Sequence, residues 1–297
     1  MSHAGTQSPE GLDRLVTEAG GTSELDYELR STVDLVELMS RAEDAVPTAM
    51  RRVAGDIAAA IDAITERLAG GGRLVYVGAG TSGRLAALDA GECQATFSTP
   101  PGQVIALTAA DESAEDDRAG GAASIRTAGV TAGDVVVGVS ASGRTPYVAG
   151  ALEAAAEGGA RTVALVCVAH SELSRLADYT IAVIVGPEFI AGSTRLKAGT
   201  AQKLVLNAIS TISMMRLGKT FGNLMVDVAP ANEKLRGRVR RIVRTATGAS
   251  PDEVDAALEA AGGETKVAIV SLLGDVDAET ARSRLRAADG SVRRALR

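Results

Sequence analysis

The sequence is poor in aromatic residues, and it carries no excess of positive charge. Four tyrosines, three phenylalanines and no tryptophan among 297 residues exclude a platform on which the bases of single-stranded nucleic acid stack. A formal net charge of −6 excludes the basic field that attracts nucleic acid or anionic membrane. We therefore expect neither nucleic acid nor a membrane among the partners of this chain.

Cysteine and histidine are too few for a disulfide framework or a structural zinc site. The two cysteines, Cys93 and Cys167, are typical of buried thiols in a reducing compartment. With only two histidines besides, we expect no metal site. Apolar runs such as 163–169 have the length of a strand and are too short to cross a bilayer. The first residues are polar and lack the apolar core of a signal peptide, so the expected location is the cytoplasm.

Apolar runs of strand length alternate with helical patterns in the middle of the chain. The expected strands are 73–77, 104–108, 134–139, 162–168 and 180–185. Continuous apolar strands that alternate with helices are typical of a parallel sheet covered on both faces. The expected fold class is α/β, as a three-layer αβα sandwich with a parallel sheet and a small helical C-terminal subdomain.

The flanking segments differ from this alternating region in composition. Residues 1–22 are rich in Gly, Ser and Thr and have no period, which predicts a flexible arm. Helical periodicity follows over 28–41 and 47–69, the second with its apolar residues on one face. A capping box at Ser250 to Glu253 marks a helix start near the C-terminus. The expected parts are the arm (1–22), an α/β domain with N-terminal helices (23–235) and a small helical, UBA-like subdomain (236–297).

Two loops rich in glycine and hydroxyl groups follow the first and third expected strands. Residues 78–83 read Gly-Ala-Gly-Thr-Ser-Gly, and residues 140–146 read Ser-Ala-Ser-Gly-Arg-Thr-Pro. The first matches G-x-G-x-x-G, a weak dinucleotide signal when it stands alone. Ligands of open α/β sheets bind at the carboxyl ends of the strands, so both loops can hold one small anion through hydroxyl groups and helix N-termini. The alternative is two ordinary tight turns. The candidate binding residues are Thr81, Ser82, Gly83, Ser140, Ser142 and Thr145.

Carboxylates and lysines occur close to the same loops in the sequence. Glu92 follows the first loop, and five acids occur between Asp111 and Asp117. A carboxylate beside an anion pocket is useful where a proton must be moved on the bound substrate. The alternative interpretation is that the acids 111–117 form the solvated start of a helix, where negative charge favours the helix dipole. The segment 186–203 adds glycines, hydroxyl groups and two of the five lysines. Lys203 is therefore a further candidate for anion binding, unless the segment is only a well-capped interface helix.

Together these motifs resemble one family, the N-acetylmuramic acid 6-phosphate etherases, over roughly residues 12–297. The segments that carry the resemblance are 78–84, 140–147, 192–203 and 221–228. Segment 192–203 is similar to the etherases and their relatives, the glucokinase regulatory proteins. Segments 78–84 and 140–147 are similar to the wider sugar-isomerase (SIS) fold. The resemblance implies a homodimeric carbon–oxygen lyase that binds a sugar phosphate, needs no cofactor and splits a D-lactyl ether in cell-wall recycling.

The resemblance also implies roles for two glutamates. Glu92 matches the proton donor of the family, and Glu115 matches an additional active-site residue. The connection 109–113 is shorter than is usual in the family, so Glu115 keeps its place or Glu112 substitutes for it. In an open-chain sugar one carboxyl group can take the proton from C2, beside the C1 aldehyde, and another can protonate the ether oxygen leaving C3. We expect Glu92 as the acid and Glu115 as the base or water activator, with the opposite assignment open.

Three other functions compete with this one. An aldose–ketose sugar-phosphate isomerase on the same fold would share the proton abstraction at C2 but would release no lactate. A non-catalytic phosphosugar sensor that resembles the glucokinase regulatory proteins would carry two tandem SIS domains, and this chain has room for one. A dinucleotide-dependent oxidoreductase would use the first loop and leave the serine-rich second loop without a role.

Overall fold

The computed structural model describes residues 26–227 and 233–297, so the expected arm lies outside the described residues. The chain forms two compact units. The first contains the described residues up to Asp89 together with Ile105–Ile209. The second contains Ala90–Val104 together with the described residues from Ser210 onward.

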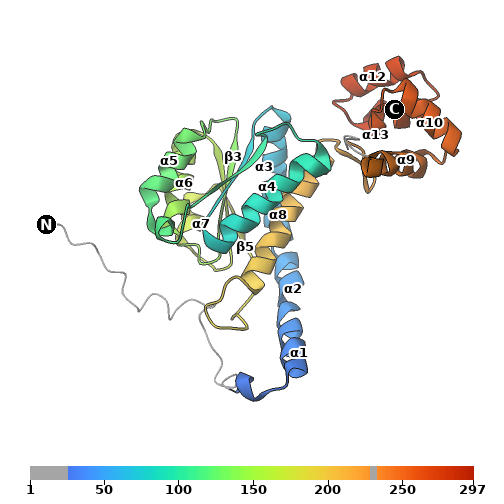
Figure 1. Cartoon of the computed structure of the whole chain (residues 1–297). Helices are drawn as coiled ribbons and strands as arrows, with labels where there is room; N and C mark the ends of the chain where they lie inside the picture. Colours follow the sequence, from blue (N-terminus) through green and yellow to red (C-terminus); the bar gives the residue numbers. More distant parts are fainter. Residues whose placement is uncertain (1–25, 228–232) are drawn as a thin grey trace. The chain divides into compact units, whose positions relative to one another are not determined.

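A parallel sheet forms the centre of the first unit (Figure 1). Its strands are β1 (Leu74–Gly78), β2 (Val104–Thr108), β3 (Val135–Ser140), β4 (Arg161–Val166) and β5 (Tyr179–Ala182). Their order is β2-β1-β3-β4-β5, and the ladders β1–β3, β3–β4 and β4–β5 are parallel. All five strands therefore lie where the sequence predicts them, within two or three residues at the ends.

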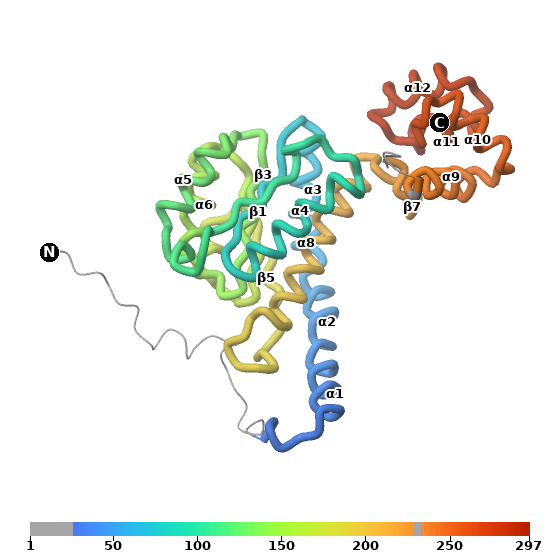
Figure 2. Tube along the Cα trace, in the orientation of Figure 1, coloured from blue at the N-terminus to red at the C-terminus, as the bar shows by residue number. Residues whose placement is uncertain are grey.

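Helices cover both faces of this sheet. Figures 1 and 2 show α5 and α6 on one face and α3, α4 and α8 on the other. The bounds are Ala54–Ala69 for α3, Gly80–Phe97 for α4, Arg118–Thr127 for α5, Pro146–Glu157 for α6, Glu172–Leu176 for α7 and Lys197–Arg216 for α8. The expected three-layer αβα sandwich is confirmed.

The burial of the central strands explains why they carry no polar alternation. Every residue of β1 and β3 is buried, because each side chain meets one of the two helical layers. Val75 and Val77 pack with the side chains of α6. The Tyr76 hydroxyl, on the other face, donates to the Asp89 carboxylate of α4 at 2.9 Å. Asn207 of α8 donates to the same carboxylate at 2.7 Å, so buried polar contacts join this helical layer to the sheet.

The N-terminal helices are shorter than the periodicity predicts. The helix expected over 47–69 is two helices, α2 (Ala45–Arg52) and α3, because the backbone of Val53 leaves the helical region at φ −109°. A β-branched residue such as valine favours helix less than alanine or leucine does. α1 (Thr32–Glu43) precedes them and has no buried residue.

The second unit contains the helices of the C-terminal region. They are α9 (Glu233–Thr247), α10 (Pro251–Ala260), α11 (Thr265–Gly274), α12 (Ala278–Ala287) and α13 (Val292–Ala295), preceded by a hairpin of β6 (Thr220–Phe221) and β7 (Leu224–Met225). The capping box expected at the start of α10 is present. Val226, Val243 and Ile269 belong to a buried cluster of this unit, so the unit has a hydrophobic core of its own.

The described part of the chain contains no helix long and apolar enough to cross a membrane. It also contains no group of three or more His, Cys, Asp or Glu side chains arranged to hold a metal ion. Within the described part of the chain, Cys93 and Cys167 are buried and form no disulfide bond. Burial, together with the charge of Glu188, raises the pKa of Cys167 to about 12, so this thiol stays protonated at neutral pH.

Candidate functional site

The strand order places one crevice at the carboxyl end of the sheet. β1 and β3 are neighbours, while β2 and β4 lie on their outer sides. The chain therefore leaves β1 and β3 toward opposite edges, and ligands of doubly wound sheets bind at such a point. The two loops singled out from the sequence follow these two strands, so the topology brings them to the same crevice.

The first loop turns tightly from β1 into α4. A Cβ atom on Gly83 would lie 2.8 Å from the main-chain oxygen of Gly78, and Gly80 has a φ of +53°. Both positions therefore favour glycine. Ser82 is half-buried, and its hydroxyl donates to Oε1 of Gln202 at 2.9 Å. Thr81 accepts a hydrogen bond from Arg84 at 3.0 Å. The close turn lets the N-terminus of α4 open toward the crevice, where its N–H groups favour an anion.

The second loop is held by hydrogen bonds among its own hydroxyl groups. The oxygens of Ser140 and Thr145 lie 2.8 Å apart, and the Gly143 N–H donates to Ser140 at 3.1 Å. Gly143 has a φ of +64°, and a Cβ atom there would collide with Ser171. Ser142 is half-buried and accepts the Arg144 N–H at 3.3 Å. The loop is thus pre-organised before any ligand arrives.

Glu115 lies between the two loops. Thr145 of the second loop donates to its Oε1 at 3.1 Å. Its Oε2 lies 3.9 Å from the position that a Cβ atom on Gly80 of the first loop would take. The side chain is half-buried, whereas Glu112 is exposed. The short connection after β2 therefore keeps Glu115, and not Glu112, at the crevice.

Other acids of the run 111–117 serve the local backbone. Asp111 accepts hydrogen bonds from the Ser113 hydroxyl at 2.7 Å and from the Ala114 N–H at 3.0 Å, and these bonds lower the pKa of its carboxyl group. Asp117 caps α5 by accepting the Gly120 N–H at 2.8 Å. The alternative interpretation, that the acids of this run lie at a solvated helix start, therefore holds for Asp111 and Asp117 and does not describe Glu115.

The start of α8 lies against the first loop. The buried carboxylate of Glu188 accepts the N–H groups of Lys197 and Ala198, both at 2.9 Å, and so caps this helix. A Cβ atom on Gly199 would lie 3.8 Å from the methyl group of Thr81. Gln202, one turn further along α8, receives the hydrogen bond from Ser82. The motif singled out in the sequence therefore supports the first loop through its backbone and through Gln202.

Two of the candidate residues, Lys203 and Glu92, take no part in the described contacts that join the two loops, Glu115 and the start of α8. Lys203 is exposed on α8, whereas Lys197 is buried; in the sequence nothing distinguished these two lysines. Glu92 is exposed on α4, twelve residues beyond Gly80. At 1.5 Å per residue this is a rise of about 18 Å along the helix. Gln202 and Glu188 were not predicted as site residues, because their roles depend on contacts with segments distant in sequence.

Family models match the region that contains these loops. Residues 56–156 match the N-terminal SIS domain of glucokinase regulatory protein, and residues 119–212 match the SIS domain. A solved structure of a putative sugar-phosphate isomerase from Listeria monocytogenes superposes with a TM-score of 0.52 at 17% identity. The superposition covers 63% of this chain and 91% of that one. At this identity the likeness concerns the fold alone.

Curated relatives match nearly the whole chain. A protein from Rubrobacter xylanophilus is 56% identical over 97% of both chains, and one from Streptomyces avermitilis is 52% identical over 100% of this chain and 97% of its own. A third, from Escherichia coli, is 47% identical over 96% of this chain and 98% of its own. All three are named N-acetylmuramic acid 6-phosphate etherase.

Proposed function

This chain belongs to the N-acetylmuramic acid 6-phosphate etherase family, and from that premise we propose the reaction and the residues that carry it out. The enzyme is a carbon–oxygen lyase of amino-sugar recycling. It splits the D-lactyl ether of N-acetylmuramic acid 6-phosphate and, with one water molecule, yields N-acetylglucosamine 6-phosphate and D-lactate. The support is full-length identity of 47–56% to relatives of that name.

The elimination requires two proton transfers, one from C2 and one to the ether oxygen on C3. A base takes the proton from C2 of the open-chain sugar, and the electron pair enters an enolate with the C1 aldehyde. The C3–O bond then breaks, an acid protonates the departing oxygen as lactate leaves, and a C2=C3 double bond forms. Water adds at C3 and a proton returns to C2. Each positioned carboxyl group contributes about 10²–10⁴-fold to such a sequence.

The structural observation that best supports this proposal is the position of Glu115 beside the two loops 78–83 and 140–146, which are rich in glycine and hydroxyl groups. Thr81, Ser82 and Gly83 of the first loop, with Ser140, Ser142 and Thr145 of the second, would bind the 6-phosphate and fix the sugar. Because the Glu115 carboxylate lies 3.1 Å from Thr145, a sugar anchored there would present its carbons to this carboxylate. We assign Glu115 as the base or water activator and Glu92 as the acid.

We also propose that the enzyme is a homodimer and that Glu92 of one copy serves the loops of the other. The exposed apolar residues Val33 and Val36 of α1, 67% and 64% exposed, belong to a helix without a buried residue. Such a surface favours a second copy as its cover. The rise of about 18 Å from Gly80 to Glu92 along α4 exceeds the reach of a sugar phosphate held at the N-terminus of the same helix.

The remaining assignments are also proposals. Lys203, exposed on α8, would contribute positive charge to the phosphate from outside the loops. Residues 23–235 would form the phosphosugar-binding domain, and residues 236–297 the helical subdomain. Two buried cysteines without a disulfide bond in the described chain are typical of a protein kept in the reducing cytoplasm.

Replacing Ser82 by alanine is expected to raise KM by about 10–100-fold, because a hydrogen bond to a charged phosphate is worth about 1.5–3 kcal/mol. In the absence of ligand the Ser82 proton is given to Gln202, and the buried Nε2 of Gln202 has no partner in the described chain. Rotation of that amide would let Nε2 donate to Ser82 and free the Ser82 proton for phosphate. Steady-state kinetics measure the effect, and S174A on α7 is the matched control. An unchanged KM in S82A would remove the first loop from the binding site.

The function itself is tested by incubating the purified protein with N-acetylmuramic acid 6-phosphate. We expect equal amounts of D-lactate and N-acetylglucosamine 6-phosphate, and no lactate from the sugar without its phosphate. A ketose phosphate without lactate would instead identify an isomerase. Tight binding of the substrate without any turnover would identify a sensor.

A further inference from the structure

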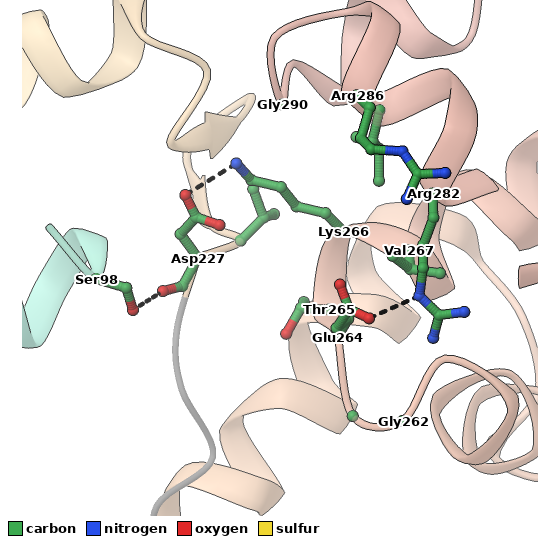
Figure 3. Close-up of a pocket in the computed structure, with 13 residues that line it drawn as sticks. Ser98, Asp227, Gly262, Glu264, Thr265, Lys266, Val267, Arg282, Arg286 and Gly290 are labelled. Carbon is green, nitrogen blue, oxygen red and sulfur yellow. Dashed lines mark hydrogen bonds and ion pairs between the residues drawn. The ribbon is translucent and has the colours of Figure 1, made fainter. Parts of the chain in front are cut away.

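A cavity lies in the helical unit, and the reaction above makes no use of it. Its volume is about 550 Å³, and it is lined by Asp227, by residues 262–264, by Thr265 and Lys266 at the start of α11, and by Arg282 and Arg286 of α12. Figure 3 shows Lys266 extending toward Asp227, while the two arginines lie on the α12 side. Ser98 also lines the cavity, and its hydroxyl donates to the main-chain oxygen of Asp227. The volume is in the range of pockets for small metabolites.

A buried hydroxyl group in the wall of this cavity has no hydrogen-bond partner among the described residues. Thr265 is 4% exposed, and its Oγ1 makes no hydrogen bond to any described residue. Figure 3 shows this hydroxyl turned to the side of the loop on which Asp227 lies. A buried polar atom without a partner destabilises the fold. Its presence in the wall of a cavity is explained if a ligand supplies the missing partner.

The first turn of α11, which begins at Thr265 in the wall of this cavity, has no side-chain cap. Glu264 occupies the N-cap position but makes no capping bond; its carboxylate pairs with Arg282 at 2.8 Å instead. The first intrahelical bond is donated by Ala268. The N–H groups of the first turn, which include that of Thr265, are therefore available to an acceptor, and the helix dipole favours an anion. The positive φ values of Gly262 and Gly263 turn the chain into this helix start.

The charges around the cavity also favour an anion. Asp227 is held by two ammonium groups, those of Lys219 and Lys266, each at 2.9 Å, so this cluster is positive overall. Arg286 is 69% exposed, and among the described residues it pairs only with Glu279, at 3.4 Å. An exposed pair of this kind is weak, and Arg286 can turn toward a ligand at little cost. A hydroxyl, uncapped N–H groups and cations thus surround one space.

We propose that this cavity binds the phosphoryl group of a small phosphorylated metabolite, at a second site distinct from the two loops. A phosphate presents several acceptor oxygens and two negative charges, and it can satisfy Thr265, the first turn of α11 and Lys266 together. The cavity walls contributed by Val226, Val267 and Leu285 would contact the apolar face of the carrier. Occupation would stabilise the helical unit, because the bound state alone satisfies the Thr265 hydroxyl.

The variant Thr265→Val separates this site from the first one. Valine keeps the shape but removes the unpartnered hydroxyl, so in phosphate-free buffer we expect the melting temperature to rise by about 2–4 °C. Calorimetric titration of the full chain should give two bound phosphoryl groups per chain for the unaltered protein and one for T265V. Lyase activity should not change. R286Q should weaken the second site about tenfold, whereas R284Q, an exposed arginine of the same helix, should leave it intact.

The probes are inorganic phosphate, N-acetylglucosamine 6-phosphate and unphosphorylated N-acetylglucosamine. Binding of the first two at the Thr265-dependent site supports a phosphoryl site, and a tighter sugar phosphate identifies a sugar as the carrier. Equal stoichiometry and affinity in T265V and the unaltered protein would overturn the proposal. So would a second site that takes the unphosphorylated sugar equally well.

Discussion

Replacing Glu115 by glutamine is expected to lower kcat by about 10²–10⁴-fold while KM stays within a few-fold of its original value. Glutamine keeps the acceptor oxygen that Thr145 contacts at 3.1 Å, so the loop geometry and the phosphate site persist. The variant loses only the ability to exchange a proton. Steady-state rates of lactate release measure kcat and KM separately, and that separation distinguishes a chemical role from a binding role.

The neighbouring acids provide the matched controls. Glu112 and Asp116 are exposed, so E112Q and D116N should retain nearly full turnover. If E112Q is the inactive variant and E115Q is normal, the base is Glu112, and the proposed assignment of this run is wrong. Loss of substrate binding in E115Q would show that the carboxylate supports the loops and does not take part in the chemistry.

Replacing Glu92 by glutamine is expected to lower kcat by a comparable factor, about 10²–10⁴-fold. The amide cannot protonate the oxygen that leaves C3, while the phosphate loops remain unaltered and substrate binding persists. Gln94 is exposed two residues further along α4, and Q94A should behave as the unaltered enzyme. Near-normal turnover in E92Q would remove this residue from the mechanism.

A mixture of the two inactive variants tests whether one site draws on two copies. In a dimer of E92Q with E115Q, one site would contain both replacements and the other would contain neither. Random association of equal amounts makes half of the dimers mixed, so about a quarter of the normal activity should return on mixing. If each site takes both glutamates from one chain, every site in the mixture carries a replacement, and no activity returns.

The layers of the fold could be predicted because they depend on local patterns. The apolar runs and the Gly/Ser loops identify the five strands and the two turns without any knowledge of pairing. The strand order could not be read from the sequence, since it depends on packing between distant segments. The break at Val53 was missed for a similar reason, because the apolar period runs through it without interruption.

The site could be predicted at its loops but only in part elsewhere. The residue pattern alone does not separate the five acids between residues 111 and 117. The family resemblance narrows them to Glu115 or Glu112, and the contacts with Thr145 and Gly80 distinguish Glu115. The two lysines of the 186–203 segment also look equivalent, yet Lys197 is buried at the helix start and Lys203 is exposed. Gln202 lies in the segment 192–203 but was not singled out within it, because its contact with Ser82 joins residues far apart in the chain.

The central claim is that the ether breaks on the sugar side, at C3, after proton loss at C2. The most direct test is the reaction in water enriched in oxygen-18, followed by mass spectrometry of both products. Elimination and re-addition predict the label in the C3 hydroxyl of N-acetylglucosamine 6-phosphate and none in lactate. Label in the lactate hydroxyl, with none in the sugar, would mean that the bond breaks on the lactyl side, and it would contradict the roles proposed for Glu92 and Glu115.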